Sequence, residues 1–98
     1  MSVMADQLPG WGSRPCGGTH LVLWYGPLEP DEPGGYVEPV DRRVWREALA
    51  CRVCASCPFR LPCLESEAGL EPGQVWGVRG GLTARGRRAL YRRRRAAA

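Results

Sequence analysis

The stretch CRVCASCPFRLPC, residues 51–63, carries four of the five cysteines of this 98-residue chain, and the fifth, Cys16, lies far upstream. The chain has 13 glycines, 9 prolines and a single phenylalanine, so it has few side chains with which to build an apolar core. A domain of this size has a folding balance close to zero unless a disulfide set or a bound metal holds it together. We therefore expect the cysteines to form the centre of the fold.

The amino-terminal residues MSVMADQLPGWGSRPC lack a basic segment followed by an apolar one, so they do not resemble a secretory signal. No apolar run approaches the roughly 20 residues that a membrane span needs. We expect a cytoplasmic protein without membrane association, in which the thiols stay reduced. Clustered cysteines in that compartment indicate metal binding or redox chemistry rather than disulfides; a secreted, disulfide-bonded mini-protein is the less favoured alternative.

The cysteine spacing favours an iron–sulfur site over a zinc site. Structural zinc sites usually combine two C-x2-C pairs, whereas here Cys54 and Cys57 form one pair that is followed by Cys63 alone. The single histidine, His20, has no spacing that recommends it as a ligand. Three clustered cysteines with a remote fourth are more typical of iron–sulfur proteins. Spacing alone leaves two ligand sets open: Cys51, Cys54, Cys57 and Cys63, or Cys16, Cys54, Cys57 and Cys63.

Helices are predicted on both sides of a long loop. Residues 17–25 favour a short helix, and residues 26–40, with four prolines and four acidic residues, predict a flexible acidic loop. Asp41 is expected to cap a helix over residues 42–54. The apolar stripe of that helix would contain Val44, Ala48 and Cys51, with Trp45 and Leu49 beside it, so we expect Cys51 to be a small buried apolar residue.

The prolines and glycines that follow define the remaining elements. Pro58 and Pro62 should interrupt the chain, and a helix over residues 61–68 should end at Gly69. Residues 71–81 predict a turn region. Thr83 can cap a last helix over residues 84–95.

The charge is distributed very unevenly. All ten acidic residues and six of the 14 arginines lie in residues 1–71, which gives a net charge of −4. Residues 72–98 hold eight arginines and no acid, a net charge of +8. A basic block at one end of a chain is typical of an interaction with nucleic acid.

In order and spacing these motifs resemble the WhiB-like (Wbl) family of iron–sulfur transcription regulators. That family has a remote cysteine, a C-x2-C-x5-C motif, a Gly/Trp turn and a basic tail. Here these are Cys16, VCASCPFRLPC (53–63), QVWGVRGGLT (74–83) and RGRRALYRRRR (85–95). The chain departs from the family in its acidic loop, in the extra Cys51, and in its turn. In the turn, Gln74 replaces the first glycine, and Val78 and Arg79 separate the glycines.

The resemblance implies an all-α domain of about four short helices around a [4Fe-4S] cluster, with a loop-rich amino-terminal half and a basic carboxy-terminal tail. The implied ligands are Cys16, Cys54, Cys57 and Cys63. A turn containing Trp76, Gly77, Gly80 and Gly81 would dock on the carboxy-terminal region of the primary σ subunit of RNA polymerase; the alternative for Trp76 is a core aromatic. The implied DNA contacts are Arg85, Arg87, Arg88, Arg92, Arg93, Arg94 and Arg95.

The resemblance also implies two functional units and one mode of regulation. Residues 1–83 would bind the cluster and σ, and residues 84–98 would bind DNA, in a monomer that binds one σ subunit. A response to O2 or NO would loosen the four-cysteine clamp and so change how the turn and the tail are presented.

Three other functions remain as alternatives. A ferredoxin-like electron-transfer protein would not explain the arginine-rich tail, and a zinc-binding nucleic-acid module is distinguished by metal analysis. A dithiol reductase would need a strand–helix redox scaffold around its C-x2-C pair. The chain has no Ser/His/Asp set and no phosphate-binding glycine loop, so we expect that it is not an enzyme.

Overall fold

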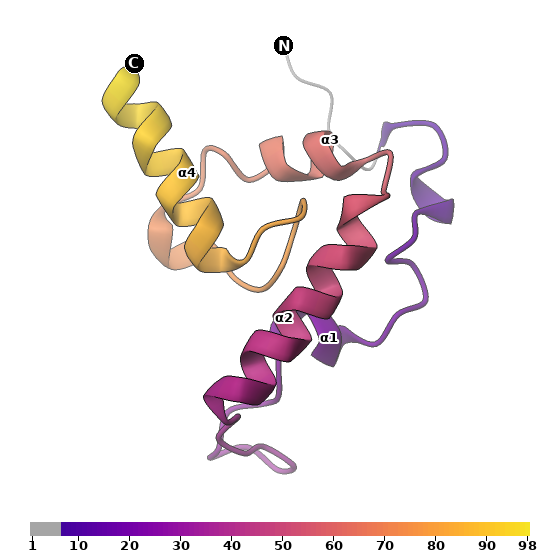
Figure 1. Cartoon of the computed structure of the whole chain (residues 1–98), viewed down its shortest axis with the longest axis vertical. Coiled ribbons are helices and arrows are strands. Elements are labelled where there is room, and N and C mark those ends of the chain that lie inside the picture. Colours follow the sequence, from indigo (N-terminus) through magenta and orange to yellow (C-terminus); the bar gives the residue numbers. More distant parts are fainter. Residues whose placement is uncertain (1–6) are drawn as a thin grey trace.

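The computed structural model describes residues 7–98, which form four α-helices joined by turns (Figure 1). The helices are α1 (Leu21–Tyr25), α2 (Val40–Ala55), α3 (Arg60–Glu65) and α4 (Ala84–Ala97), with short 3-10 helices η2 (Trp11–Ser13) and η3 (Pro72–Gln74). Residues 7–98 contain no β-strand. The predicted all-α class, with a loop-rich amino-terminal half, is confirmed. The first six residues of the predicted 1–83 unit lie outside the described part of the chain.

Helix α2 begins one residue earlier than the expected cap. Pro39 occupies the N-cap position with an extended backbone, and Asp41 lies inside the first turn. The prediction that Asp41 caps this helix is therefore wrong. Its carboxylate still lies near the positive end of the helix dipole, where a negative charge is favourable. Pro58, just beyond the end of the helix, prevents its continuation.

The buried face of α2 differs from the predicted stripe. Ala50 is fully buried and Cys54 is 8% exposed, whereas Val44 and Trp45 are 58% and 71% exposed. Of the predicted stripe, only Cys51 is half-buried. The small side chains of Ala50 and Cys54 share a core with Trp24 of α1, so α1 packs closely along this face of α2 (Figure 1).

Helix α3 is shorter than predicted and begins earlier. It ends at Glu65, and hydrogen-bonded turns cover the residues up to Leu70, so the predicted end at Gly69 is wrong. Pro62 does not interrupt the chain but lies in the first turn of α3. A proline is tolerated there because the first N–H groups of a helix have no partner within it.

Two small cores meet at the turn formed by residues 74–83. One core contains Trp24, Ala50, Cys54 and Val78. The other contains Leu64, Val75 and Tyr91. Because Val75 and Val78 belong to different cores, the turn joins α1 and α2 on one side to α3 and α4 on the other.

Helix α4 is partly a core element. The Thr83 hydroxyl accepts a hydrogen bond from the Gly86 N–H at 3.1 Å, which confirms the predicted cap. Tyr91 is 3% exposed, and its hydroxyl donates to the Leu64 carbonyl at 2.5 Å. All residues after Tyr91 are exposed, so the first half of α4 packs on the domain and the second half projects from it (Figure 1).

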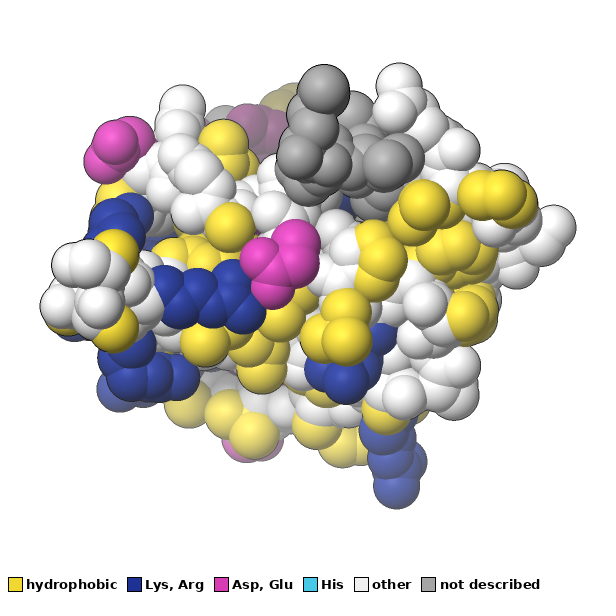
Figure 2. Space-filling view, turned by 90° about the horizontal axis from the view of Figure 1, so that it is seen from above, with side chains coloured by type: hydrophobic (Ala, Val, Ile, Leu, Met, Phe, Trp, Pro, Cys, Tyr) yellow, Lys and Arg dark blue, Asp and Glu magenta, His cyan; other side chains and the backbone are white. Residues whose placement is uncertain are grey.

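The charges follow this division of α4. Seen from above, arginine side chains gather on the side where α4 lies, and apolar side chains cover much of the remaining face (Figure 2). The loop predicted over residues 26–40 has no regular structure over residues 26–39, and its last residue, Val40, instead begins α2. The loop is attached to α2 by an ion pair between Glu38 and Arg46, with 2.7 Å between Oε2 and Nε. Within residues 7–98, no helix has the length and apolar character needed to cross a membrane.

Candidate functional site

Four of the five cysteines line a single cavity between η2, the end of α2, and α3. They are Cys16, Cys54, Cys57 and Cys63. The other lining residues are Trp11, Arg14, Val53, Phe59, Arg60 and Gly80. Cys51 does not line this cavity but packs against the core of Trp24 and Ala50. Of the two cysteine sets that the spacing leaves open, the structure brings together the one that contains Cys16.

Local backbone structure brings these cysteines to the cavity. Cys57 lies in the turn that ends α2, and its N–H donates to the Cys54 carbonyl at 3.0 Å. Pro58 then turns the chain, and the Phe59 N–H donates to the Cys57 sulfur at 3.4 Å. Cys63 is in α3, one helical turn after Phe59. The x2 and x5 spacings thus correspond to a helix end, a proline turn and the start of the next helix.

Burial disfavours ionisation of two of the four thiols, Cys54 and Cys63. It raises the pKa of Cys54, against the smaller opposing effect of the Gly81 backbone amide. It also raises the pKa of Cys63, where the charge of Arg79 and the Gly80 amide partly offset it. A bound metal reverses this preference because a coordinating thiol is deprotonated. The site is therefore suited to thiols that ionise when they bind a metal.

The wall of the cavity is aromatic and its charged side chains are cationic. The rings of Trp11 and Phe59 meet edge to face, with centroids 5.6 Å apart. The Arg14 guanidinium lies 4.3 Å from the centre of the Trp11 ring. Within residues 7–98, Arg60 is the other charged lining residue, and no carboxylate of this part of the chain lines the cavity. Sulfur is thus the metal-binding donor that these side chains offer, in a positively charged setting.

Within residues 7–98, no group of three or more His, Cys, Asp or Glu side chains is close enough to hold a single metal ion. A [4Fe-4S] cluster makes a different demand, since each of its four cysteines binds a separate iron atom. Four thiols distributed around one cavity match that donor set in number and in chemistry.

The turn formed by residues 74–83 lies directly against the cysteine helices. Gly77 and Gly80 have φ values of 66° and 61°, a region that favours glycine. A Cβ on Gly77 would come within 2.6 Å of the Tyr25 ring, and one on Gly80 within 2.6 Å of the Leu64 Cβ. Both positions are therefore restricted to glycine by conformation and by contact.

Trp76 projects outward from this turn. Its side chain is 66% exposed although its neighbour Val75 is fully buried, so Trp76 is not a core aromatic. Gly80, in contrast, is buried against Leu64. The added Cβ of Gly81 would face the Arg60 side chain at 3.1 Å. These two glycines shape the turn, and Trp76 provides its exposed surface.

The arginines of α4 fall into two groups, which corrects part of the predicted DNA surface. Arg87 is fully buried, and its guanidinium donates to the carbonyls of Trp76 at 2.7 Å and Gly77 at 2.8 Å. It cannot reach DNA in this structure. Arg88 donates to the carbonyls of Pro72 and Val75, and Arg94 pairs with Glu65. Arg85, Arg92, Arg93 and Arg95 are exposed, and within residues 7–98 none of them forms an ion pair.

Arg79 is a structural part of the site that sequence reasoning missed. Its Nε donates to the Cys63 carbonyl at 3.3 Å, and its guanidinium also donates to the Ser66 hydroxyl at 3.2 Å. It thus attaches the turn to α3 beside a cysteine. The only signal in the sequence is that Arg79 belongs to the two residues inserted between the glycines of the turn.

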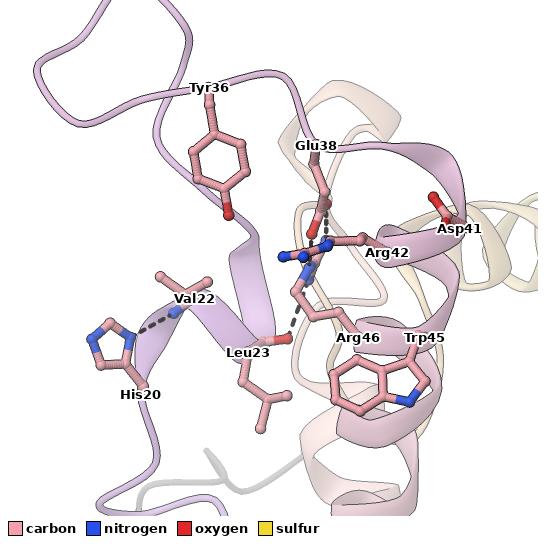
Figure 3. A pocket seen from close by; sticks show the side chains of 9 residues that line it. All are labelled: His20, Val22, Leu23, Tyr36, Glu38, Asp41, Arg42, Trp45 and Arg46. Atoms are coloured by element: carbon pink, nitrogen blue, oxygen red, sulfur yellow. Dashed lines mark hydrogen bonds and ion pairs between the residues drawn. The ribbon is translucent and has the colours of Figure 1, made fainter.

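A second, larger cavity lies between α1, the acidic loop and the start of α2 (Figure 3). Several of its polar groups already have partners: Glu38 pairs with Arg46, which also donates to the Leu23 carbonyl. His20 caps α1 by accepting a hydrogen bond from the Val22 N–H at 3.2 Å. His20 therefore has a structural role away from the cysteine cavity.

Comparison with known proteins identifies the family. A family model described as "Transcription factor WhiB" matches residues 30–90, more than half of the chain. The matched region contains the C-x2-C-x5-C motif, the Trp76 turn and the packed half of α4. A search of curated proteins found no match. Together with the four cysteines around one cavity, the family match shows that the chain belongs to the WhiB family of transcription factors.

Proposed function

We propose that this transcription factor binds a [4Fe-4S] cluster through Cys16, Cys54, Cys57 and Cys63. We further propose that it docks on the carboxy-terminal region of the primary σ subunit through the turn around Trp76, and contacts DNA through α4. The main support for this proposal is the cavity lined by the four cysteines. Gly80 of the turn also lines this cavity, so the proposed cluster site and the proposed σ-docking turn are in direct contact. We also propose a cytoplasmic location, in agreement with a role in transcription.

The residues around the cavity support a cluster in three ways. The four thiols supply the ligand set of a [4Fe-4S] cluster. Arg14 and Arg60 provide positive charge against the thiolates. The backbone amides of Gly80 and Gly81 favour ionised sulfur at Cys63 and Cys54. When bound, such a cluster would link the turn at Cys16 to the end of α2 and to α3, and these residues would hold its ligands in place.

The exposed indole supports the σ-docking role. A large aromatic side chain on a rigid turn loses little conformational entropy on binding, and such residues often dominate protein interfaces. Trp76 fits this description because Val75 and Val78 anchor the turn on both sides.

The DNA role rests on the exposed arginines in the projecting part of α4 and at its start. Arginine side chains bind phosphates through a planar fork and release counterions from DNA. After the correction for the buried and paired arginines, the proposed contacts are Arg85, Arg92, Arg93 and Arg95.

The cluster is tested by anaerobic purification followed by iron and sulfide assays and an absorption spectrum. Cys16→Ala should abolish stable cluster binding. Cys51→Ala is the matched control, since the half-buried Cys51 packs against the core outside the cavity. Loss of iron from Cys51→Ala with retention in Cys16→Ala would refute the ligand set. A zinc-containing, colourless protein would refute the cluster and favour the zinc module.

The two partners are tested with separate variants. Trp76→Ala should weaken co-purification with σ more than it lowers the iron content. Replacing Arg92, Arg93 and Arg95 with Gln should reduce DNA affinity and flatten its salt dependence by roughly 0.9 log units per lost phosphate contact for each tenfold change in salt. An iron-containing protein that binds neither partner would point to electron transfer instead. A response to O2 or NO predicts that either gas, added to the anaerobic protein, changes these two affinities.

A further inference from the structure

Arg87 is a buried charge in a helix whose other arginines are all at least partly exposed. Removing an ionised group from water is costly unless it is paired and hydrogen-bonded. Among residues 7–98, the Arg87 guanidinium has one carboxylate partner, Glu67, at 3.2 Å. Its Nε atom is buried and has no hydrogen-bond partner in this described part of the chain. A neutral side chain would avoid this cost, so the position calls for an explanation beyond solubility or DNA binding.

The guanidinium collects carbonyls from the turn of residues 74–83. It donates to Trp76, Gly77 and Leu82 at distances of 2.7, 2.8 and 3.0 Å. These carbonyls come from both sides of the Gly80–Gly81 pair, so Arg87 links the two arms of the turn. A planar fork with fixed donor directions sets the orientation of the peptide planes that it binds. Because the carbonyls of Trp76 and Gly77 face Arg87, their direction constrains how the Trp76 side chain leaves the backbone.

The same residue belongs to the packed face of α4. Arg87 and Tyr91 are one helical turn apart and therefore lie on the same side of the helix. Tyr91 packs with Leu64 and Val75. Arg85 and Arg92 are exposed. The contacts of Arg87 and Tyr91 thus set the rotation of α4 about its own axis, and this rotation sets the direction in which the exposed arginines point.

We infer that Arg87 is a positioning residue that couples the exposed surface around Trp76 to the exposed arginines of α4. The inference rests on the proposed σ and DNA functions of these two surfaces. If the turn and α4 order each other through Arg87, binding of the first partner to one of them also restricts the motion of the other. The second partner then loses less conformational entropy when it binds. The second partner then binds more tightly, and the effect is equal in both directions.

The test measures DNA affinity of the full-length, cluster-loaded protein with and without the carboxy-terminal region of σ. The wild-type protein should bind DNA roughly fivefold or more tightly when σ is bound, which is the lower end of typical coupling. Arg87→Gln should bring this ratio close to one and weaken σ binding. Arg85→Gln is the matched control: it removes the same charge from an exposed position, so DNA affinity should fall while the ratio stays as in the wild type.

Arg87→Lys separates a positioning role from a general loss of structure. It keeps the charge beside Glu67, but an ammonium group lacks the planar fork that orients several carbonyls at once. We expect a folded protein with an intermediate ratio. The inference is overturned if Arg87→Gln keeps the wild-type ratio, or if it behaves like Arg85→Gln in both affinities.

Amide hydrogen exchange provides a test that needs neither partner. Arg87→Gln should accelerate exchange in residues 74–83 and in residues 84–91 together, whereas Arg85→Gln should not. If this occurs but even the wild-type protein binds no σ, the proposed function is wrong and the link through Arg87 stands. If Arg87→Gln leaves exchange in both segments unchanged, Arg87 does not hold them together and the inference is wrong.

Discussion

Replacing Gly80 with alanine should displace the turn of residues 74–83 from the cysteine helix. Gly80 has a φ of 61°, and an added Cβ would lie 2.6 Å from the Leu64 Cβ, 2.7 Å from its Cα and 2.8 Å from its N. Two of these three atoms are backbone, so trimming the Leu64 side chain would not relieve the clash. Either the turn or α3 must move.

The cost has two separable parts. A left-handed backbone costs an alanine about 1–2 kcal/mol relative to glycine. Overpacking against a closely packed neighbour adds about 1–3 kcal/mol. Gly34→Ala isolates the first part, because Gly34 has a φ of 81° and nothing lies within 4 Å of the added Cβ. Gly80→Ala should therefore cost about 2–5 kcal/mol, and Gly34→Ala about 1–2 kcal/mol.

The assay is urea unfolding of both variants and the wild-type protein, followed by far-UV circular dichroism under anaerobic conditions. Iron content after identical purification gives a second readout, since Gly80 lines the cysteine cavity. Gly80→Ala should lose iron and Gly34→Ala should not. Equal losses of stability in the two variants, with equal iron content, would refute the reasoning, because the close approach to Leu64 would then contribute nothing.

Three further predictions concern the cap of α4, the ion pair between Glu38 and Arg46, and the length of α4. Thr83→Ala removes the cap of α4 and should lower the free energy of unfolding by about 1 kcal/mol in urea titrations, against Thr83→Ser as the control. The Arg46 guanidinium holds the pKa of Glu38 below its usual value of 4.5, so the stability from this pair is present above pH 4.5 and is lost as pH falls through the lower folded-state pKa. The unfolding midpoints of wild-type protein and Glu38→Gln should therefore converge below pH 4.5; a constant gap would contradict the assignment. Ending the chain after Thr83 should reduce both stability and σ binding, because it removes Tyr91 from the core. Ending the chain after Tyr91 should affect DNA affinity alone. Equal σ binding by the two truncated chains would contradict the core role of α4.

Local signals in the sequence predicted several elements correctly. The Thr83 cap, the loop of residues 26–39 and the four-helix all-α class depend on short-range chemistry: a hydroxyl that accepts from the backbone, prolines that exclude helix, and helix-forming stretches between them. The cysteine spacing likewise reflects local structure, since a helix end and a proline turn account for the positions of Cys54, Cys57 and Cys63.

Errors arose where a neighbour decided the outcome. The pattern of α2 predicted Val44 and Ala48 on the buried stripe, but α1 packs on the side of Ala50 and Cys54. Helical periodicity shows where apolar side chains lie around a helix and not which side meets a partner. The wrong helix cap is a smaller error of another kind. The predicted N-cap of α2, Asp41, lies two residues after the observed one, Pro39, which is within the usual uncertainty of a helix boundary.

The sequence by itself determined which residues are available to the site: five cysteines, a tryptophan among glycines, and a basic carboxy-terminal block. Only the tertiary structure decided which residues act together. Cys16 lines the same cavity as Cys54, Cys57 and Cys63 although it is far from them in sequence, whereas Cys51, only three residues before Cys54, packs against the core outside the cavity. Arg87 and Arg85 are indistinguishable in the string RGRR, yet one is buried under the turn and the other faces solvent. The reason is physical: burial and pairing depend on which segments approach each other in space, and a run of like side chains contains no record of that approach.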